Sequence, residues 1–411
     1  MGFLAAGLLL ATGCSKANMQ PIRIGAVYPL AGAQGPGGID EHRGVLLAAQ
    51  LANQDGGVNG RPIRITSIDV EAADAAPAAI SQLHAQGIDL VLGSYGSTIS
   101  APASEAAAKD GMFFWETGAV AMLPPASDSG GLTFRVPPTG GVLGGTAVSF
   151  IATRFAPTLH RDPSTLRFGV SFVNDIYGRT VATGAENEIK ARGLTLAGTF
   201  GYDPTSFDAN ALARRIAAAH VDVLFDSGYL DDAVAIRRAL IRNHVPLVAA
   251  IGTSSSYCMP QFGQRLGTQA VGLFASDKPD FAVMNPAALT PAGAALLQRA
   301  NAAYRARYGA DMSAPALAGF SGAWGLFAHV LPDAAALTPT AVADAARAVN
   351  LPPGSLPNGS GLHFSPLGSS DPGANLNAAS VVEEWVSPGH TEVVWPPKFA
   401  EHPIVPMDIN P

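Results

Sequence analysis

The chain has 411 residues, which exceeds the size that one hydrophobic core ordinarily serves, so we expect two lobes. With 48% hydrophobic and 14% charged residues, its composition excludes a fibrous or disordered chain. The formal net charge of -7 argues against a nucleic-acid partner, because phosphate binding requires clustered Lys and Arg.

The N-terminus combines a short apolar run with a cysteine. Residues 1–14 read MGFLAAGLLLATGC, which is shorter than the about 20 residues of a membrane-spanning helix but suits a secretory signal. Ala11 to Cys14 resembles a bacterial lipobox, although Leu is more usual than Ala11 and no basic segment precedes the run. We therefore expect a signal peptide over 1–13, a lipid on Cys14 and a tether over 14–20, with membrane contact only through the lipid. A buried first helix is the alternative.

From Pro21 onward, short β-rich runs alternate with helical stretches, which predicts an α/β protein with parallel sheets covered by helices on both faces. The first series of expected elements is strand 22–28, helix 38–53, strand 63–70, helix 73–86, strand 88–93, helix 98–110 and strand 112–115.

A second series begins near residue 140. The expected elements are helix 140–155, strand 166–173, helix 177–192, strand 195–201, helix 207–219, strand 221–225, helix 231–243 and strand 246–251. In helix 177–192, Val181, Ala185 and Ile189 fall on one face and Gly193 ends the helix.

The pattern changes after about residue 270. There we expect helices 290–307, 314–330 and 339–348, a Gly/Pro/Ser-rich stretch 352–373, and a hairpin formed by 380–385 and 391–395. Strands that reappear so late indicate that the chain crosses back between lobes. The predicted division is 21–139 plus 277–364 for lobe 1 and 140–276 plus 365–411 for lobe 2, two doubly wound open sheets joined by a multi-stranded hinge.

Common catalytic motifs are missing from the sequence. It contains no G-x-S-x-G, H-E-x-x-H, C-x-x-C or P-loop pattern, so we expect no enzyme. The nine histidines form no ligand-spaced cluster, so we expect no metal and no cofactor. Cys258 is the one cysteine besides Cys14, which predicts that the mature chain has no internal disulfide.

Several motifs carry a resemblance to a known family. They are IGAVYPLAG (24–32), NQDGGVNGR (53–61), VLGSYGS (91–97), APAS (101–104) and NDIYG (174–178). In this order and spacing they resemble the leucine/isoleucine/valine-binding protein family, which serves ABC importers of hydrophobic amino acids and amides. The resemblance extends from Pro21 to about Trp395 and implies a type I periplasmic-binding-protein fold.

The resemblance also implies a function. A monomeric receptor in the periplasm or at the cell surface would capture a small-molecule ligand by hinge closure and deliver it to an ABC permease of the branched-chain amino acid type. Two alternatives stay open: a ligand-sensing subunit of the same fold for a signalling partner, and a lipoprotein that binds a larger hydrophobic ligand.

The first-lobe part of the site is expected around Ser97. Gly96, Ser97 and Thr98 lie between a strand and the first turn of a helix, where free N–H groups form an anion site. Ser97 matches the family serine that binds the substrate carboxylate, and capping of the helix by Ser97 or Thr98 is the alternative. Ala119 and Val120 match positions where the family uses backbone groups and a threonine, so only backbone contacts are expected there.

The ammonium end of the site departs from the family. The family's amine-binding acid falls near Ser254, where no acid is present. Leaving an ammonium unpaired in a closed cleft costs several kcal/mol, so either Glu116 takes this role or the ligand lacks an ammonium. An ion pair of Glu116 with Arg43 or Arg135 is an equal alternative.

Aromatic residues are expected to close the site. Tyr177 and Tyr229 match family tyrosines that cover the ligand with an apolar face and a polar tip. Phe320 matches a further aromatic contact, with core packing as the alternative. The pocket-lining aromatic of the family's first loop falls on Gly37, which predicts a roomier or different pocket.

Overall fold

The computed structural model describes residues 20–410 except 33 and 122–130. The expected signal peptide over 1–13 and the lipid site at Cys14 lie outside the described residues, as does the tether up to residue 19.

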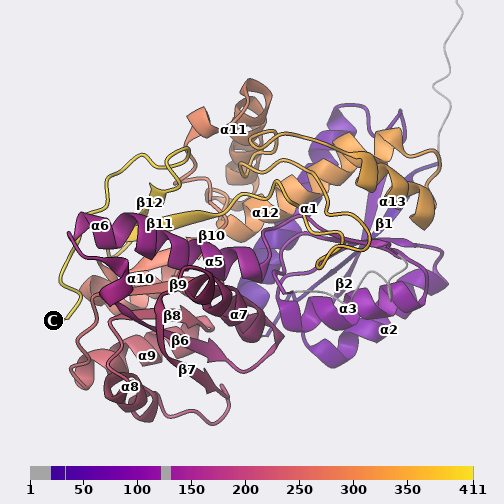
Figure 1. Ribbon diagram of the computed structural model, residues 1–411. Coiled ribbons are helices and arrows are strands. Elements are labelled where there is room, and N and C mark those ends of the chain that lie inside the picture. Colours follow the sequence, from indigo (N-terminus) through magenta and orange to yellow (C-terminus); the bar gives the residue numbers. More distant parts are fainter. Residues whose placement is uncertain (1–19, 33, 122–130, 411) are drawn as a thin grey trace, which may run out of the picture.

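The first lobe is built on a sheet of five strands in the order β2-β1-β3-β4-β5, all parallel (Figure 1). Its elements are β1 (Ile22–Tyr28), α1 (Gly35–Gln54), β2 (Ile63–Asp69), α2 (Ala76–Ala85), β3 (Leu90–Gly93), α3 (Ser97–Lys109), β4 (Phe113–Glu116), β5 (Thr133–Arg135), α11 (Pro291–Tyr308), α12 (Ala314–Gly325) and α13 (Pro339–Ala348).

The second lobe is built on a sheet of seven strands in the order β12-β11-β10-β9-β8-β6-β7. Its strands are β6 (Arg167–Val173), β7 (Thr195–Tyr202), β8 (Val223–Ser227), β9 (Ala249–Thr253), β10 (Phe274–Asp277), β11 (Val381–Ser387) and β12 (His390–Trp395). Its helices are α5 (Gly140–Phe150), α6 (Ala156–Thr158), α7 (Ile176–Ala191), α8 (Ala209–Ala218), α9 (Leu230–Arg242) and α10 (Pro260–Leu266). The pairing is parallel except where β11 pairs with β10 and β12, and the two doubly wound sheets confirm the expected α/β fold class.

Alternating side chains bury both faces of the first sheet. Along β1, Ala26 and Tyr28 face the core beneath α1 and α12, whereas Val27 faces the core beneath α2 and α3. On β3, Leu92 faces the core beneath α1 and α12, and Val91 faces the core beneath α2 and α3. Because successive side chains of a strand point to opposite faces, a parallel sheet covered on both sides needs such continuous apolar runs.

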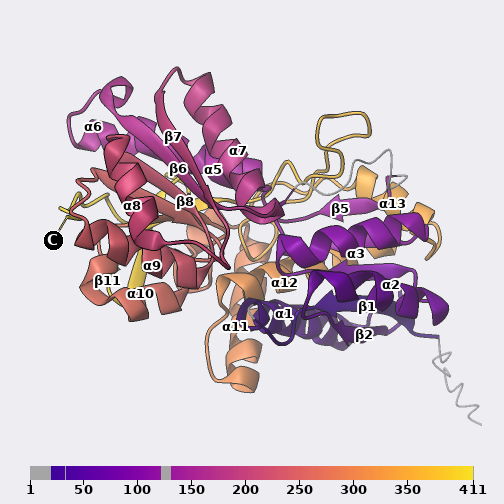
Figure 2. The same ribbon diagram turned by 90° about the horizontal axis from the view of Figure 1, so that it is seen from below.

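The chain crosses between the lobes after β10 and returns at β11. Figure 2 shows the lobes side by side, with α11 and α12 next to α1 in the first lobe. The return was expected at residue 365, but the chain stays against the first lobe until Val381. Ala374 bridges Arg135, the Asn375 amide donates to the Val136 carbonyl at 3.0 Å, and Phe364 packs edge-on against Trp115.

One described segment, Ala314–Asp333, is long and apolar enough to cross a membrane, with a mean hydropathy of 1.2. It consists of α12 and the turns that follow it, and 78% of its most apolar window is buried inside the protein. Burial against α1 accounts for its composition, since a core helix is apolar on most of its faces.

Asp226 on β8 carries a carboxyl group inside the second lobe with no exposed surface. Burial raises the pKa of Asp226 to about 7, an effect that Ser171 opposes and the Asp232 carboxylate reinforces. Because this pKa is higher in the folded than in the unfolded protein, the folded state binds more protons. The stability that Asp226 contributes is therefore present below about pH 4 and lost as the pH rises through about 7.

We predict that Asp226→Asn raises the free energy of unfolding at pH 8 by about 1–3 kcal/mol, because it removes a charge from an apolar interior. The gain should shrink toward pH 4, where Asp226 is protonated. Urea unfolding at pH 4, 6 and 8 measures the effect. The exposed Asp74→Asn is the matched control, and an equal change at all three pH values would contradict the prediction.

Candidate ligand-binding site

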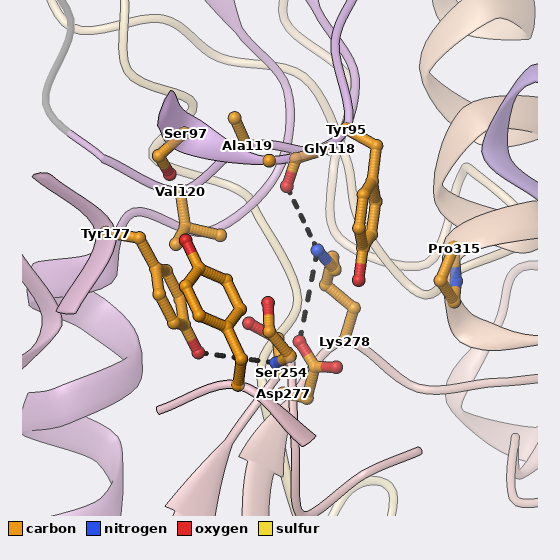
Figure 3. Close-up of a pocket in the computed structure, with 13 residues that line it drawn as sticks. Tyr95, Ser97, Gly118, Ala119, Val120, Tyr177, Ser254, Asp277, Lys278 and Pro315 are labelled. Atoms are coloured by element: carbon orange, nitrogen blue, oxygen red, sulfur yellow. Dashed lines mark hydrogen bonds and ion pairs between the residues drawn. The ribbon is translucent and has the colours of Figure 1, made fainter. Parts of the chain in front are cut away.

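A narrow pocket, with about 20 Å³ of free space, lies between the lobes at the carboxyl ends of their parallel strands (Figure 3). This is the edge at which open α/β sheets collect ligands. Its described lining from the first lobe is Tyr95, Gly96, Ser97, Gly118, Ala119, Val120 and Pro315. Its described lining from the second lobe and the crossover is Tyr177, Tyr229, Ser254, Ser255, Asp277 and Lys278.

The N-terminus of α3 opens into this pocket. Gly96 caps the helix with φ +83°, a left-handed conformation that suits glycine. The Ser97 hydroxyl accepts a hydrogen bond from the Ala121 N–H at 3.1 Å, which leaves its own proton free to be donated. Thr98 is not among the lining residues, and its hydroxyl accepts a hydrogen bond from the Gln34 side chain at 2.8 Å.

Glu116 lies beneath the pocket and does not line it. Its Oε1 accepts the N–H groups of Ser94, Gly118 and Ala119 at 3.0, 2.8 and 2.8 Å, and its Oε2 accepts the Ser100 hydroxyl. Burial raises the pKa of Glu116 well above its usual value, the Glu41 carboxylate adds to the rise, and the three backbone donors oppose it.

Neither role expected for Glu116 matches this geometry. A fully buried carboxylate that already accepts four donors is not available to a ligand ammonium. The proposed ion-pair partners are engaged elsewhere, Arg43 with Asp40 at 3.2 Å and Arg135 with Asp371. Glu116 instead joins the loop after β3 to the loop after β4, and so positions Ala119 at the pocket wall.

The two expected tyrosines come together on the second-lobe wall. Their rings stack with centroids 5.5 Å apart. The Tyr229 hydroxyl donates to the Asp175 carboxylate at 2.7 Å, and the Tyr177 hydroxyl accepts the Ser255 N–H at 3.3 Å. Burial raises the pKa of Tyr177 to about 12, so its hydroxyl keeps its proton at neutral pH. Ser254 lies beside them, as expected from the alignment of the family's acid.

Two aromatic expectations are modified by the structure. A side chain on Gly37 would overlap the Tyr95 ring, so Tyr95 fills the space that the missing aromatic was expected to leave open. Phe320 lies outside the pocket: it is fully buried in the first lobe and stacks on Trp324 at 5.9 Å, which is the core-packing alternative.

Asp277 and Lys278 are pocket residues that sequence reasoning missed. The Lys278 Nζ donates to the Gly118 carbonyl at 3.1 Å and lies 3.9 Å from the Asp277 Oδ1 (Figure 3). Both residues are buried: Asp277 has 2% and Lys278 has 4% of its surface exposed. An acid and a base next to each other in the sequence could have marked a site. Strand β10, which places them at the pocket edge, was not predicted.

A larger outer cavity of about 350 Å³ adjoins the pocket and shares Ser254 and Pro315 with it. Its wall is mixed: Asp40, Arg43 and Asp280 are charged, whereas Ile39 and Met259 are among its apolar residues. Among the residues that the structure describes, no group of three or more His, Cys, Asp or Glu side chains is arranged to hold a metal ion.

Two lobes enclose a small buried pocket between the carboxyl ends of their strands, which is an arrangement suited to holding a small molecule. Residues 21–364 match the sequence model of a family described as periplasmic binding protein. The chain therefore belongs to the periplasmic binding protein family, and the resemblance to leucine/isoleucine/valine-binding proteins is confirmed. This family consists of extracytoplasmic solute-binding proteins.

Among curated proteins, Leu/Ile/Val-binding protein homolog 8 of Brucella suis is 28% identical over 364 residues, which cover 87% of this chain and 88% of that protein. Among solved structures, leucine-binding LivK of Thermotoga maritima has a TM-score of 0.74 at 15% identity, covering 90% of this chain and 97% of that one. LivJ of Streptococcus pneumoniae, in complex with isoleucine, has a TM-score of 0.72 at 17% identity, covering 92% and 100%.

We predict that Glu116→Ala lowers the free energy of unfolding by about 2–4 kcal/mol, because the buried N–H groups of Ser94 and Gly118 lose their acceptor, whereas the Ala119 N–H keeps the Ser94 carbonyl. Glu116→Gln keeps one acceptor oxygen and should lose less. Urea denaturation measures both variants, with the exposed Glu105→Ala on α3 as control. A loss below about 1 kcal/mol for Glu116→Ala would show that water or neighbouring groups replace the carboxylate.

Proposed function

We propose that this protein captures a small carboxylate-bearing solute, such as an amino acid, an amide or a related compound, for an ABC importer with a permease of the branched-chain amino acid type. The observation that carries the proposal is the Ser97 hydroxyl, which accepts the Ala121 N–H and is left with a free proton at the N-terminus of α3.

The N-terminus of α3 favours an anion for physical reasons. The first N–H groups of a helix have no partner within it, and the helix dipole places partial positive charge there. These N–H groups and the Ser97 hydroxyl together suit a carboxylate. The stacked rings of Tyr177 and Tyr229 supply apolar area on the facing wall.

The groups that line the pocket belong to both lobes, which supports closure of the lobes around a ligand. Ser97 and Ala119 belong to the first lobe, whereas Tyr177 and Tyr229 belong to the second. A ligand that touches both sets makes more contacts when the lobes are closed than when they are open. That difference stabilises the closed state, which would be the form that a permease receives.

The lipid anchor is part of the same proposal. A lipid on Cys14 would hold the receptor at the membrane surface as a monomer, in the periplasm or at the cell surface, near its permease. In a bacterial host, we expect Cys14→Ser to move the protein from the membrane fraction to the soluble fraction, as followed by immunoblotting. An unchanged membrane fraction would remove Cys14 as the anchor.

The outer cavity favours a second candidate, a longer solute. Because it adjoins the pocket at Ser254 and Pro315, a ligand held at Ser97 has room to extend into it. Its wall combines the charged Asp40, Arg43 and Asp280 with apolar residues such as Ile39 and Met259, so it suits an extension that has both polar and apolar groups.

The central experiment is native mass spectrometry of the purified protein, followed by a thermal-shift screen across amino acids, amides, aromatic acids and lipids. A specific ligand raises the melting temperature because it binds only the folded state. We expect carboxylates to be the class that stabilises. Stabilisation by lipids alone would refute the proposal.

For a carboxylate identified in this way, we predict that Ser97→Ala weakens binding by about 1–3 kcal/mol, the cost of removing one partner from a buried polar group. Isothermal titration calorimetry measures the change. Ser81→Ala, an exposed serine on α2, is the control and should bind normally. Unchanged affinity in Ser97→Ala would take this residue out of the site.

A further inference from the structure

Glu41 on α1 is a buried acid that the proposed function does not use. Its side chain has no exposed surface. The Glu41 Oε1 accepts the Thr117 hydroxyl at 2.6 Å, and Thr117 in turn accepts the Tyr28 hydroxyl at 2.5 Å. The Glu41 Oε2 has no hydrogen-bond partner among the described residues. This is unusual, because buried carboxylates are normally hydrogen-bonded through both oxygens or paired with a cation.

The Glu41 carboxylate and Lys278 meet at Gly118. A side chain on Gly118 would overlap the Glu41 carboxylate, so this carboxylate lies directly against the pocket loop, residues 117–119. The Lys278 Nζ donates to the Gly118 carbonyl at 3.1 Å and lies 3.9 Å from the Asp277 Oδ1, which also lacks a hydrogen-bond partner among the described residues. An ammonium has three N–H groups, so Lys278 retains donors beyond the one that Gly118 uses.

Three ionisable groups act on Glu41 from other elements. They are Tyr28 on β1, Glu116 on β4 and Lys278 in the crossover. Helix α12, which packs against α1, contains no ionisable residue over Ala314–Gly325. Lys278 is therefore the cation that faces Glu41 within the part of the chain that the structure describes.

The remaining charged groups on α1 and on the elements packed against it have partners of their own or face solvent. His42 and His329, whose pKa values burial lowers, are neutral near pH 7. The engaged groups are Asp40 with Ser313 and Arg43, Arg23 with the Gln86 carbonyl, Arg299 with Asp55, Arg305 with Asp311, Arg307 with Gln50, and Asp69 with the Leu30 N–H, whereas Arg64 is exposed.

The charge of Glu41 depends on where Lys278 lies. Burial raises the pKa of Glu41 to about 7, and Lys278 and the Thr117 hydrogen bond oppose this rise. A motion that withdrew Lys278 would remove a stabilising cation, so the pKa of Glu41 would rise further. The arrangement with Lys278 at Gly118 therefore binds fewer protons above about pH 7 than one from which Lys278 has left.

Lys278 directly follows β10 of the second lobe, whereas Gly118 and Glu41 belong to the first. In this structure the lobes lie against each other, since α3 contacts α7. We propose that Glu41 is a positioning residue for solute binding: its carboxylate holds the pocket loop through Thr117 and attracts Lys278 to that loop, so that binding is coupled to the charge of Glu41. This inference rests on the proposed function, since it takes solute capture between the lobes as given.

The test measures affinity and proton release as a function of pH. The probes are L-isoleucine, L-glutamine and benzoate, three carboxylates that do not titrate between pH 6.5 and 8. Each is titrated by calorimetry into wild type in phosphate and in Tris, whose different heats of ionisation report the protons released. A probe that binds should bind about 3- to 8-fold more tightly at pH 8 than at pH 6.5 and should release protons, because the bound state holds fewer of them.

In Glu41→Gln, which keeps an acceptor oxygen for Thr117, affinity should change less than twofold over this pH range and no proton should be released. Lys278→Met should lose the pH dependence as well. Asp226→Asn is the matched control: burial also raises the pKa of Asp226 to about 7, but this acid lies inside the second lobe, so its variant should keep the pH dependence.

Glu41→Gln should fold, because burial disfavours the charge that the substitution removes, and thermal unfolding checks each variant. If it does not fold, proton release by wild type and its loss in Lys278→Met decide the inference. An affinity of wild type that does not vary with pH would overturn the inference and leave the proposed function intact. A pH dependence that persists in Glu41→Gln would assign it to another group and also overturn the inference. If no probe binds at any pH, the proposed function and this inference both fail.

Discussion

The carboxylate of Glu116 is the interaction on which the first-lobe side of the pocket depends. It lies at the end of β4 and accepts backbone N–H groups from Ser94, in the loop after β3, and from Gly118 and Ala119, in the loop after β4. Loop backbone cannot pair along a sheet, so its polar groups need another partner when they are buried. One buried side chain thus fixes two loops that carry ligand-facing groups.

The second constraint is the crossover between the lobes. β10 ends at the pocket with Asp277, and the next residue, Lys278, reaches the first lobe to donate to the Gly118 carbonyl. The loop that Glu116 positions is therefore also the one that receives the cation from the crossover. The pocket wall, the loop after β4 and the crossover therefore meet at one point, and a ligand bound as proposed above would contact both lobes there.

Most regular elements were predictable because apolar periodicity and glycine stops are local signals. The strand over 22–28 and the helix over 98–110 correspond closely to β1 and α3. The short elements β5, β10 and α10 were missed, since three to seven residues hold too little periodicity to register. Motif matching found Ser97, Tyr177 and Tyr229, which share the pocket. Phe320, also matched by motif, packs in the core, and Glu116, considered for its charge, is enclosed beneath the pocket.

The sequence by itself determined the architecture, the family and the residues at the ends of the longer strands, because these follow from patterns within short windows. Only the tertiary structure decided what each charged group contacts. Glu116 and Asp277 are both acids at strand ends, yet one is enclosed by backbone donors and the other has an oxygen without a partner. Burial and hydrogen-bond partners depend on residues distant in the chain, and these contacts distinguish a carboxylate enclosed by backbone from one that lines the pocket.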